Sequence, residues 1–260
     1  SSRSDHAFRS ACNSGFLELS KWLLIIKPDI NIEVDNEYTF QNICDNGYFE
    51  MAKWYYSINP YLNVNSNYDR ALRNAVTSGH IDIVKWLFNI NPDVEIINYE
   101  MIFTNACTNG YLDIAQWIYN LHPSINVSYE NEYVFRNTCI RGYCEVGKWL
   151  LEIKPDIDVS SHVNKIFKMT CENGNLDTAK WLYTINSVDI LTDDFFAFRN
   201  SCRNGYLFIA QWLLEILPIS INSINFNKPF TLSAINGHID ISKWLLEVKP
   251  DIDISYENDK

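Results

Sequence analysis

The fold of this chain is decided by a stretch near its end that reads Asn236-Gly237-His238-Ile239-Asp240-Ile241-Ser242-Lys243-Trp244-Leu245-Leu246-Glu247. A tryptophan follows the glycine by seven residues, and this pair recurs every 31 or 32 residues along the whole chain. The glycines are Gly15, Gly47, Gly79, Gly110, Gly142, Gly174, Gly205 and Gly237, and the tryptophans are Trp22, Trp54, Trp86, Trp117, Trp149, Trp181, Trp212 and Trp244. A fixed period in this range is typical of a solenoid, because each unit buries its apolar face only against its neighbours.

One unit shows what the repeat builds. Leu72 and Val76 place apolar side chains on one face of a short helix, and Gly79 ends that helix with a reversal of the chain. Residues 81–90 are almost wholly apolar, which predicts a second helix in the middle of a stack. Pro92 prevents its continuation. Each unit is therefore a helical hairpin followed by an extended connection.

The repeats occupy the whole chain of 260 residues, so we expect one all-α domain rather than the two that length alone suggests. The repeat boundaries fall at about 1–35, 36–67, 68–98, 99–130, 131–162, 163–193, 194–225 and 226–260. No run of 18 apolar residues is present, which predicts no membrane span.

The repeated tryptophans and cysteines are expected to be packing residues. The position two residues before each tryptophan is small, as at Ala115 or Gly147, so a bulky side chain alternates with small ones as in a close-packed layer. An exposed platform of indoles for sugars or bases is the less favoured interpretation. Six of the seven cysteines stand three residues before a glycine, where Val76 and Ala234 stand in the other units. We expect buried, reduced thiols and hence an intracellular, cytoplasmic protein.

The net charge of −11 argues against a nucleic-acid partner and favours a partner with a neutral or basic surface. The five histidines show no metal-ligand spacing, and no phosphate loop or catalytic motif occurs. His80 and His238 share the position after the glycine, which predicts a solvated turn. We therefore expect no catalytic residue, no metal and no cofactor, and a protein that is not an enzyme.

The stretch quoted first resembles the ankyrin repeat, whose pattern N-G-H-L-E-V-V-K-L-L-L-E it follows nearly position for position. The resemblance covers all eight units. It implies an ankyrin-type α-solenoid of eight helix-turn-helix repeats of 31–32 residues. The opening T-P-L-H motif of that family is absent, and the units are shortened in the connection between hairpins, called the finger. The fingers are therefore expected to be short and irregular.

The style of the repeat, rich in Asn, Ile and Tyr, is similar to that of the Trp-containing ankyrin arrays of large DNA viruses of amoebae, such as mimivirus-like viruses. The ankyrin resemblance implies a monomeric, non-catalytic scaffold that binds a protein through its concave first-helix and finger face. With a viral source, the partner would be a host protein in the host cytoplasm. The alternative is the substrate-recognition part of a ubiquitin-ligase receptor, with the recruiting segment outside this chain.

Positions that vary between repeats are the candidates for partner contact, because repeated positions are already committed to stacking. The first-helix positions near each glycine vary most, and they include aromatic and arginine side chains of the kind found at binding hot spots. The candidate contact residues are Tyr38, Arg70, Tyr133, Arg141, Glu172, Phe195, Phe196 and Arg203. Phe195 and Phe196, with Phe208 and Phe226, cluster in the last third of the chain. They predict either a contact patch or contact with a further repeat.

Overall fold

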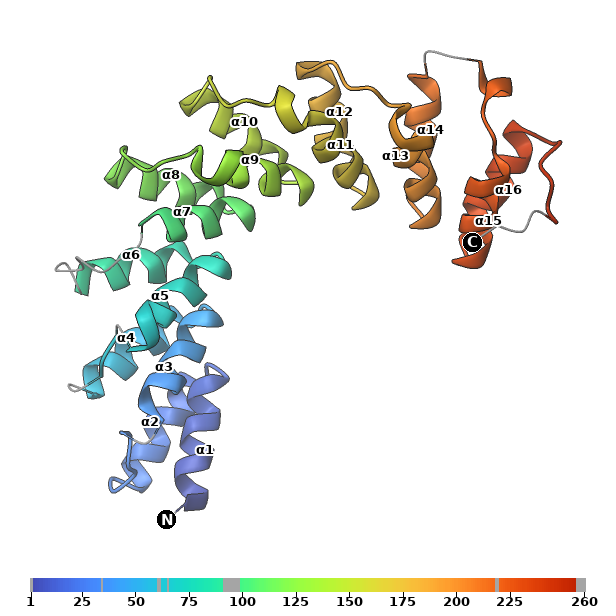
Figure 1. The fold of residues 1–260 in the computed structure, drawn as a ribbon. Coiled ribbons are helices and arrows are strands. Elements are labelled where there is room, and N and C mark those ends of the chain that lie inside the picture. The colour runs from blue at the N-terminus through green and yellow to red at the C-terminus, as the bar shows by residue number, and fades with distance from the viewer. Residues whose placement is uncertain are drawn as a thin grey trace. The chain divides into compact units, whose positions relative to one another are not determined.

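The computed structural model describes residues 2–33, 35–59, 62–64, 66–90, 99–217 and 220–255. Within these ranges the chain is all-α, with sixteen α-helices, two short 3-10 helices and no strand. The chain divides into unit 1, residues Ser1–Asn126, and unit 2, residues Val127–Lys260. Four helical hairpins lie in each unit (Figure 1).

The helices follow the repeat. Unit 1 holds α1 (Ser2–Asn13), α2 (Leu17–Ile26), α3 (Asn36–Asp45), α4 (Phe49–Ile58), α5 (Ser66–Thr77), α6 (Ile81–Ile90), α7 (Tyr99–Thr108) and α8 (Leu112–Leu121). Unit 2 holds α9 (Tyr129–Ile140), α10 (Cys144–Ile153), η1 (Ser160–His162), α11 (Val163–Glu172), α12 (Leu176–Ile185), α13 (Thr192–Arg203), α14 (Leu207–Glu215), η2 (Ile221–Ser223), α15 (Asn227–Ile235) and α16 (Ile239–Val248). The second helix predicted at 81–90 is confirmed, while Pro92 lies outside the described residues.

In both units the helices form a layered stack. Each odd-numbered α-helix, called a first helix, packs on the even-numbered second helix that follows it. Each first helix also packs on the first helix of the neighbouring hairpin in its unit (Figure 1). The predicted solenoid architecture is confirmed, because every hairpin buries its apolar side chains against its neighbours rather than in a central core.

The glycine after each first helix makes the hairpin possible. Gly174 has a φ of +87°, in the left-handed region that L side chains rarely adopt. Its N–H donates to the Cys171 carbonyl at 3.1 Å, and the Asn175 N–H donates to the Thr170 carbonyl at 3.1 Å. This pair of hydrogen bonds is the Schellman motif, which satisfies carbonyl groups left open at the helix end.

Within each unit, the residue after the glycine lies on the glycine of the preceding repeat. The Tyr206 ring covers Gly174, and the His238 ring covers Gly205. His80 covers Gly47 in the same way, and its Nε2 lies 2.9 Å from the Asp45 carbonyl oxygen. The prediction that His80 and His238 are merely solvated turn residues is therefore wrong, because both half-buried rings fill the space that a glycine leaves in the neighbouring repeat.

Replacing Gly174 by Ala is expected to destabilise the protein more than replacing Gly237. Both glycines have positive φ, so either Cβ adds the left-handed penalty of about 1–2 kcal/mol. A Cβ at Gly174 would also lie 2.6 Å from Tyr206 Cε1, whereas a Cβ at Gly237 meets nothing within 4 Å. Urea unfolding of the two variants measures the difference. Equal losses would show that the aromatic cover moves aside without cost.

The indoles pack against phenylalanines of the preceding repeat rather than against one another. Trp54 contacts Phe8, with ring centroids 6.3 Å apart, and Trp181 contacts Phe135 at 6.2 Å. Gly147 makes room for this layer, because a Cβ there would lie 3.0 Å from the Trp181 ring. The packing interpretation of the tryptophans thus holds at these positions, with the first helix of the preceding repeat as the contact.

The position three residues before the glycine is buried wherever it holds a cysteine. Cys12, Cys44, Cys107, Cys139, Cys171 and Cys202 are fully buried, and Cys144 is partly exposed. All seven thiols are free. Burial raises the pKa of the Cys12 thiol to about 11 and raises those of the other five buried thiols further. These side chains are therefore protonated packing residues at neutral pH.

The fingers are short and held by side-chain turns. Asn31 Oδ1 accepts a hydrogen bond from the Glu33 N–H at 3.0 Å, and Asp253 Oδ1 accepts one from the Ser255 N–H at 2.9 Å. These are Asx turns, in which a short polar side chain reverses its own backbone. They replace the β-hairpin in the fingers that the structure describes.

Candidate functional site

The variable positions of each first helix lie on one stripe. They stand nine, six and two residues before the glycine, and this spacing of three and four places them on the same side of a helix. The phenylalanine and cysteine positions, seven and three residues before the glycine, are buried in most repeats. We call the variable stripes of a unit, taken together, its first-helix face.

In unit 1 the face brings together two of the candidate residues. Tyr38 on α3 is 59% exposed, and Arg70 on α5 is also exposed. Both stand nine residues before their glycines, and α3 packs on α5, so the two side chains occupy matching positions on adjacent helices. An aromatic ring and a guanidinium are therefore exposed at matching positions on neighbouring first helices.

In unit 2 four candidates lie on the first-helix face. Tyr133 on α9 is 39% exposed, and Phe196 on α13 is half-buried at the equivalent position. Glu172 on α11 and Arg203 on α13 both stand two residues before their glycines. The helices α9, α11 and α13 pack in that order, so three adjacent repeats contribute to one surface.

Arg141 lies at the edge of this surface. It follows α9 as its C-terminal cap, and its backbone N–H donates to the Asn137 carbonyl at 3.0 Å. Its side chain is exposed beside Gly142, where the chain turns into the second helix. Arg141 is therefore placed to contact a ligand that extends beyond the stripe.

Phe195 differs from the expectation. Its side chain is only 5% exposed, and its ring stacks on that of Phe198 at 4.8 Å and 12°. The reason is the backbone: Asp193, Asp194 and Phe195 have φ of 53°, 56° and 57°. This left-handed turn directs Phe195 into the core, where Phe226 is also buried. Phe195 is therefore a packing residue and not an accessible contact.

The expected aromatic patch is not a single surface. Phe195 and Phe226 are buried on either side of Phe198, and the Phe226 and Phe198 ring centroids lie 5.7 Å apart. Phe208 is instead 73% exposed. Together with Ile239 it lines a cavity of about 560 Å³ at the turns that join the first and second helices of the last repeats. The four phenylalanines thus lie in different parts of the structure, and only Phe196 lies on the first-helix face.

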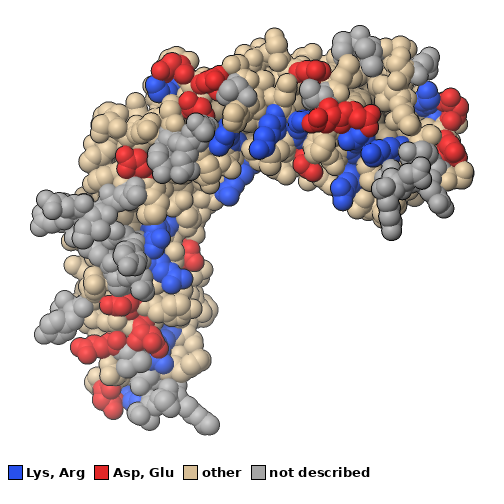
Figure 2. Space-filling view, viewed as in Figure 1, with Lys and Arg blue, Asp and Glu red and all other residues tan. Residues whose placement is uncertain are grey.

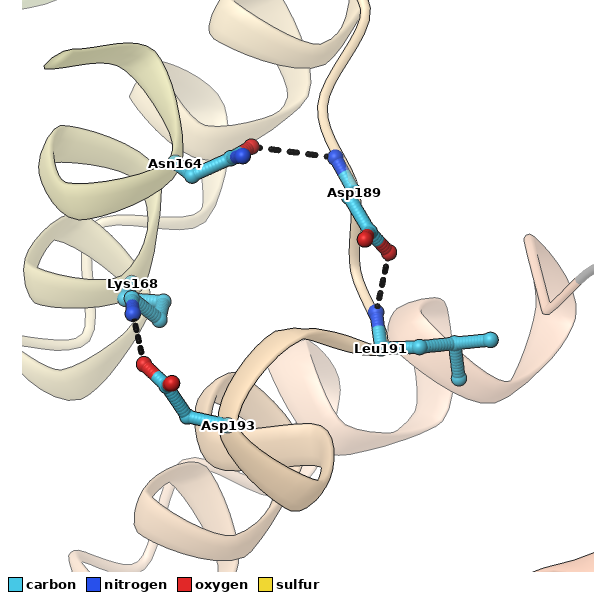
Figure 3. A network of polar contacts seen from close by, with 5 residues as sticks. All are labelled: Asn164, Lys168, Asp189, Leu191 and Asp193. Atoms are coloured by element: carbon cyan, nitrogen blue, oxygen red, sulfur yellow. Dashed lines mark hydrogen bonds and ion pairs between the residues drawn. The ribbon is translucent and has the colours of Figure 1, made fainter.

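A polar network fixes the finger that leads into α13 (Figure 3). Asn164 Oδ1 accepts a hydrogen bond from the Asp189 N–H at 3.0 Å, and Asp189 Oδ1 accepts one from the Leu191 N–H at 3.0 Å. Lys168 forms an ion pair with Asp193, and its Nζ lies 5.6 Å from the centre of the Phe196 ring. These contacts join α11 to the entry of α13, so adjacent repeats hold the face in place.

The first-helix face of unit 2 is rich in cations, which the sequence reasoning missed. Six basic residues stand at its variable positions: Arg136, Lys165, Lys168, Arg199, Arg203 and Lys228. Figure 2 shows a row of Lys and Arg side chains over the first helices of this unit, with one group of acidic side chains among them. The net charge of the whole chain gave the opposite impression. Summing charges position by position along the repeat would have revealed the row.

The acidic residues are concentrated elsewhere. Among the described residues, three second helices pair the acid three residues after the glycine with the lysine three residues further on. Examples are Glu18 with Lys21 at 2.7 Å and Glu145 with Lys148 at 2.7 Å. Many other acids stand in the fingers, as at Asp156 and Asp253. The overall charge of −11 therefore does not describe the first-helix face of unit 2.

Among the described residues, no three His, Cys, Asp or Glu side chains gather closely enough to hold a metal ion. Over the same part of the chain, each helix is too short or too polar to cross a bilayer.

The comparisons with known proteins agree with this geometry. Residues 8–98 match a family model described as ankyrin repeats in three copies. The structure is similar to the crystal structure of the human ASB11 ankyrin repeat domain, with a TM-score of 0.52 and 16% sequence identity. That similarity covers 80% of this chain and 96% of the ASB11 chain, and at this identity it shows the fold alone. The search of curated proteins gives no match.

The fold is therefore an ankyrin-repeat solenoid, and residues 8–98 carry ankyrin repeats at the level of sequence. Ankyrin repeats generally mediate protein–protein interaction and are typically non-catalytic. Neither comparison bears on a viral source, which stays a prediction from the style of the sequence.

Proposed function

We propose that this ankyrin-repeat solenoid is a non-catalytic scaffold that binds a protein partner through the concave side formed by its first helices and fingers. One observation supports the proposal most. On the first helices, the positions shared by all repeats are largely buried, while the exposed positions differ from repeat to repeat. A specific binding surface requires exposed side chains that differ from one another on a rigid support. The fold provides this, because stacking does not constrain the residue type at the exposed positions.

The second helices are less suited to the role. Their tryptophans contact phenylalanines of the preceding repeat, and their outer acids and lysines pair within the same helix. Ion pairs of this kind lie at the same position in α2, α4 and α10 and offer little to distinguish one partner from another. The first-helix face carries instead the unlike side chains Tyr133, Glu172 and Arg203.

We also place the protein in the cytoplasm, acting as a monomer. Six thiols buried in a close-packed layer support a reducing compartment, because proteins of oxidising compartments generally pair their cysteines.

The test is capture of partners from cell extract by the full-length protein, followed by hydrogen-exchange mapping of the complex. Protection on α9, α11 and α13, the first helices of three repeats, is the expected result. A footprint on the second helices around Lys85, Gln116 and Lys148 would contradict the proposal. Recovery of ubiquitin-ligase subunits with the full-length protein would assign the alternative role, a substrate-recognition part of a ligase receptor.

Replacing Tyr133 by Ala is expected to weaken the captured complex by about 2 kcal/mol or more, as at an aromatic hot spot. Unfolding free energy should change by only about 0.5 kcal/mol, because Tyr133 is partly exposed. Lys148→Ala on the second helix of the same repeat is the matched control, and it should leave binding unchanged. Titration calorimetry measures the binding affinity of the two variants. Loss of binding in the Lys148 variant alone would reverse the assignment of faces.

A further inference from the structure

The cations of unit 2 form an ordered row. Arg136 on α9, Lys168 on α11 and Arg199 on α13 all stand six residues before their glycines, so they share one register on three adjacent first helices. Neighbouring packed helices lie about 8–10 Å apart, which sets the spacing of the row. Lys165 and Lys228 stand one helical turn to one side of the row. A line of positive charge thus crosses the repeats.

Two members of the row already hold carboxylates. Lys168 pairs with Asp193 and Arg199 pairs with Asp194, both from the turn that opens α13. That turn is left-handed at three non-glycine residues, a conformation that carries an energetic cost for L residues. The ion pairs offset part of this cost. The side chains of the row are therefore able to pair with carboxylates, and two of them already do so with carboxylates of this chain.

Other cations around the row remain unsatisfied. Among the described residues, no ion pair or hydrogen bond involves the side chains of Lys165, Arg203 or Lys228. Lys165 and Arg203 are exposed, and Lys228 lines a cavity of about 350 Å³ with Arg199 at the entry of α15. The only carboxylate at the variable positions of these helices is that of Glu172. The face therefore retains a positive field after its internal pairs are counted.

We propose that the first-helix face of unit 2 binds an acidic, extended peptide segment of a partner protein, with carboxylates about three residues apart. An extended chain in the polyproline II conformation has three residues per turn and rises about 3.1 Å per residue, so every third side chain lies on the same side and advances roughly 9 Å, close to the spacing between adjacent first helices. The exposed rings of Tyr133 and Phe196 supply apolar contact beside the charges. This inference rests on the proposed function and names the chemistry of its ligand.

The test uses fluorescence anisotropy with the full chain and labelled peptides of about twelve residues. One peptide carries Asp at every third position among Gly and Ser, a second carries Asn in place of Asp, and a third carries the same number of Asp at every second position. The first peptide is expected to bind, with affinity that falls as salt is raised. The Asn peptide should bind at least about tenfold more weakly, and the third peptide should also bind more weakly.

A triple variant locates the site. Lys165→Gln, Arg203→Gln and Lys228→Gln together remove three cations that form no ion pair with the residues that the structure describes. Because an exposed pair changes affinity by about twofold or more, the triple variant should weaken peptide binding by about tenfold. The matched control, Lys148→Gln with Lys180→Gln and Lys243→Gln, removes the same charge from the second helices and should weaken binding by less than about twofold.

Three results would overturn the inference: equal binding of the Asp and Asn peptides, equal binding of the two Asp spacings, or equal losses in the two triple variants. Tighter binding of single-stranded oligothymidylate, lost in the first triple variant, would also overturn it and assign the face to nucleic acid. Failure of the proposed function is distinguishable. If a captured protein protects the first helices but no acidic peptide binds, the inference fails and the scaffold function stands.

Discussion

Raising the pH from about 8 to about 10 is expected to remove on the order of 8 kcal/mol from the unfolding free energy of this protein. Six buried cysteines have an ordinary thiol pKa of 9.0; burial raises the pKa of Cys12 to about 11 and raises the pKa of each of the other five well above the ordinary value. Above pH 9.0 the unfolded chain releases these protons while the folded chain retains them. Each thiol therefore costs about 1.4 kcal/mol of stability per pH unit above that value.

The direction follows from the raised pKa. Stability from a group whose pKa is raised by folding is complete below the unfolded pKa and is lost as the pH rises through the folded one. The loss should begin near pH 9 and continue to about 11, the pKa of Cys12, and beyond for the others. Since small proteins are stable by about 5–15 kcal/mol, alkaline unfolding should occur within this range. Urea unfolding at a series of pH values measures it.

The repeat supplies the control. Val76 is fully buried at the position where other repeats have cysteine, so Cys107→Val and Cys139→Val are substitutions that the fold already accepts. Each should reduce the alkaline loss by about 1.4 kcal/mol per pH unit without changing stability much near pH 7. If a variant without the buried thiols loses stability above pH 9 as steeply as the native chain does, thiol ionisation is not the cause.

Replacing Trp212 by Ala is expected to cost about 3–5 kcal/mol, the range for large aromatic side chains truncated in cores. Trp212 is 9% exposed, and its ring lies 6.0 Å from Phe167 and 5.9 Å from Tyr183, both in the preceding repeat. Truncation leaves a cavity between two repeats, so the loss includes stacking as well as burial. Chemical denaturation of unit 2 in the full chain measures the change.

Trp22 is the matched control, because it occupies the same position in the first repeat and is 54% exposed. Its replacement by Ala should cost no more than about 1 kcal/mol. The comparison separates packing between repeats from the contribution of an indole within its own helix. Similar losses at Trp22 and Trp212 would show that contact with the preceding repeat contributes little.

Much of the fold follows from the period of the sequence. A glycine followed seven residues later by a tryptophan predicts a helix end, a tight turn and a second helix, and α6 begins and ends at the predicted residues. This succeeds because each repeat is built from short-range signals and contacts only its neighbours. The exposed candidates Tyr38, Arg70 and Tyr133 were found for the same reason: a variable position within a fixed pattern is one that stacking does not need.

The sequence by itself thus determined the architecture and the buried layer, and it marked the variable stripe that we propose as the binding surface. Tertiary structure alone decided the burial of Phe195 and the pairing of Lys168 with Asp193. It also decided how the cations of three helices join in one row, which no single repeat contains. The physical reason is that these features depend on interactions between repeats. The left-handed turn at Asp193 is held by an ion pair with a lysine of the preceding repeat. The row of charge depends on how neighbouring helices pack.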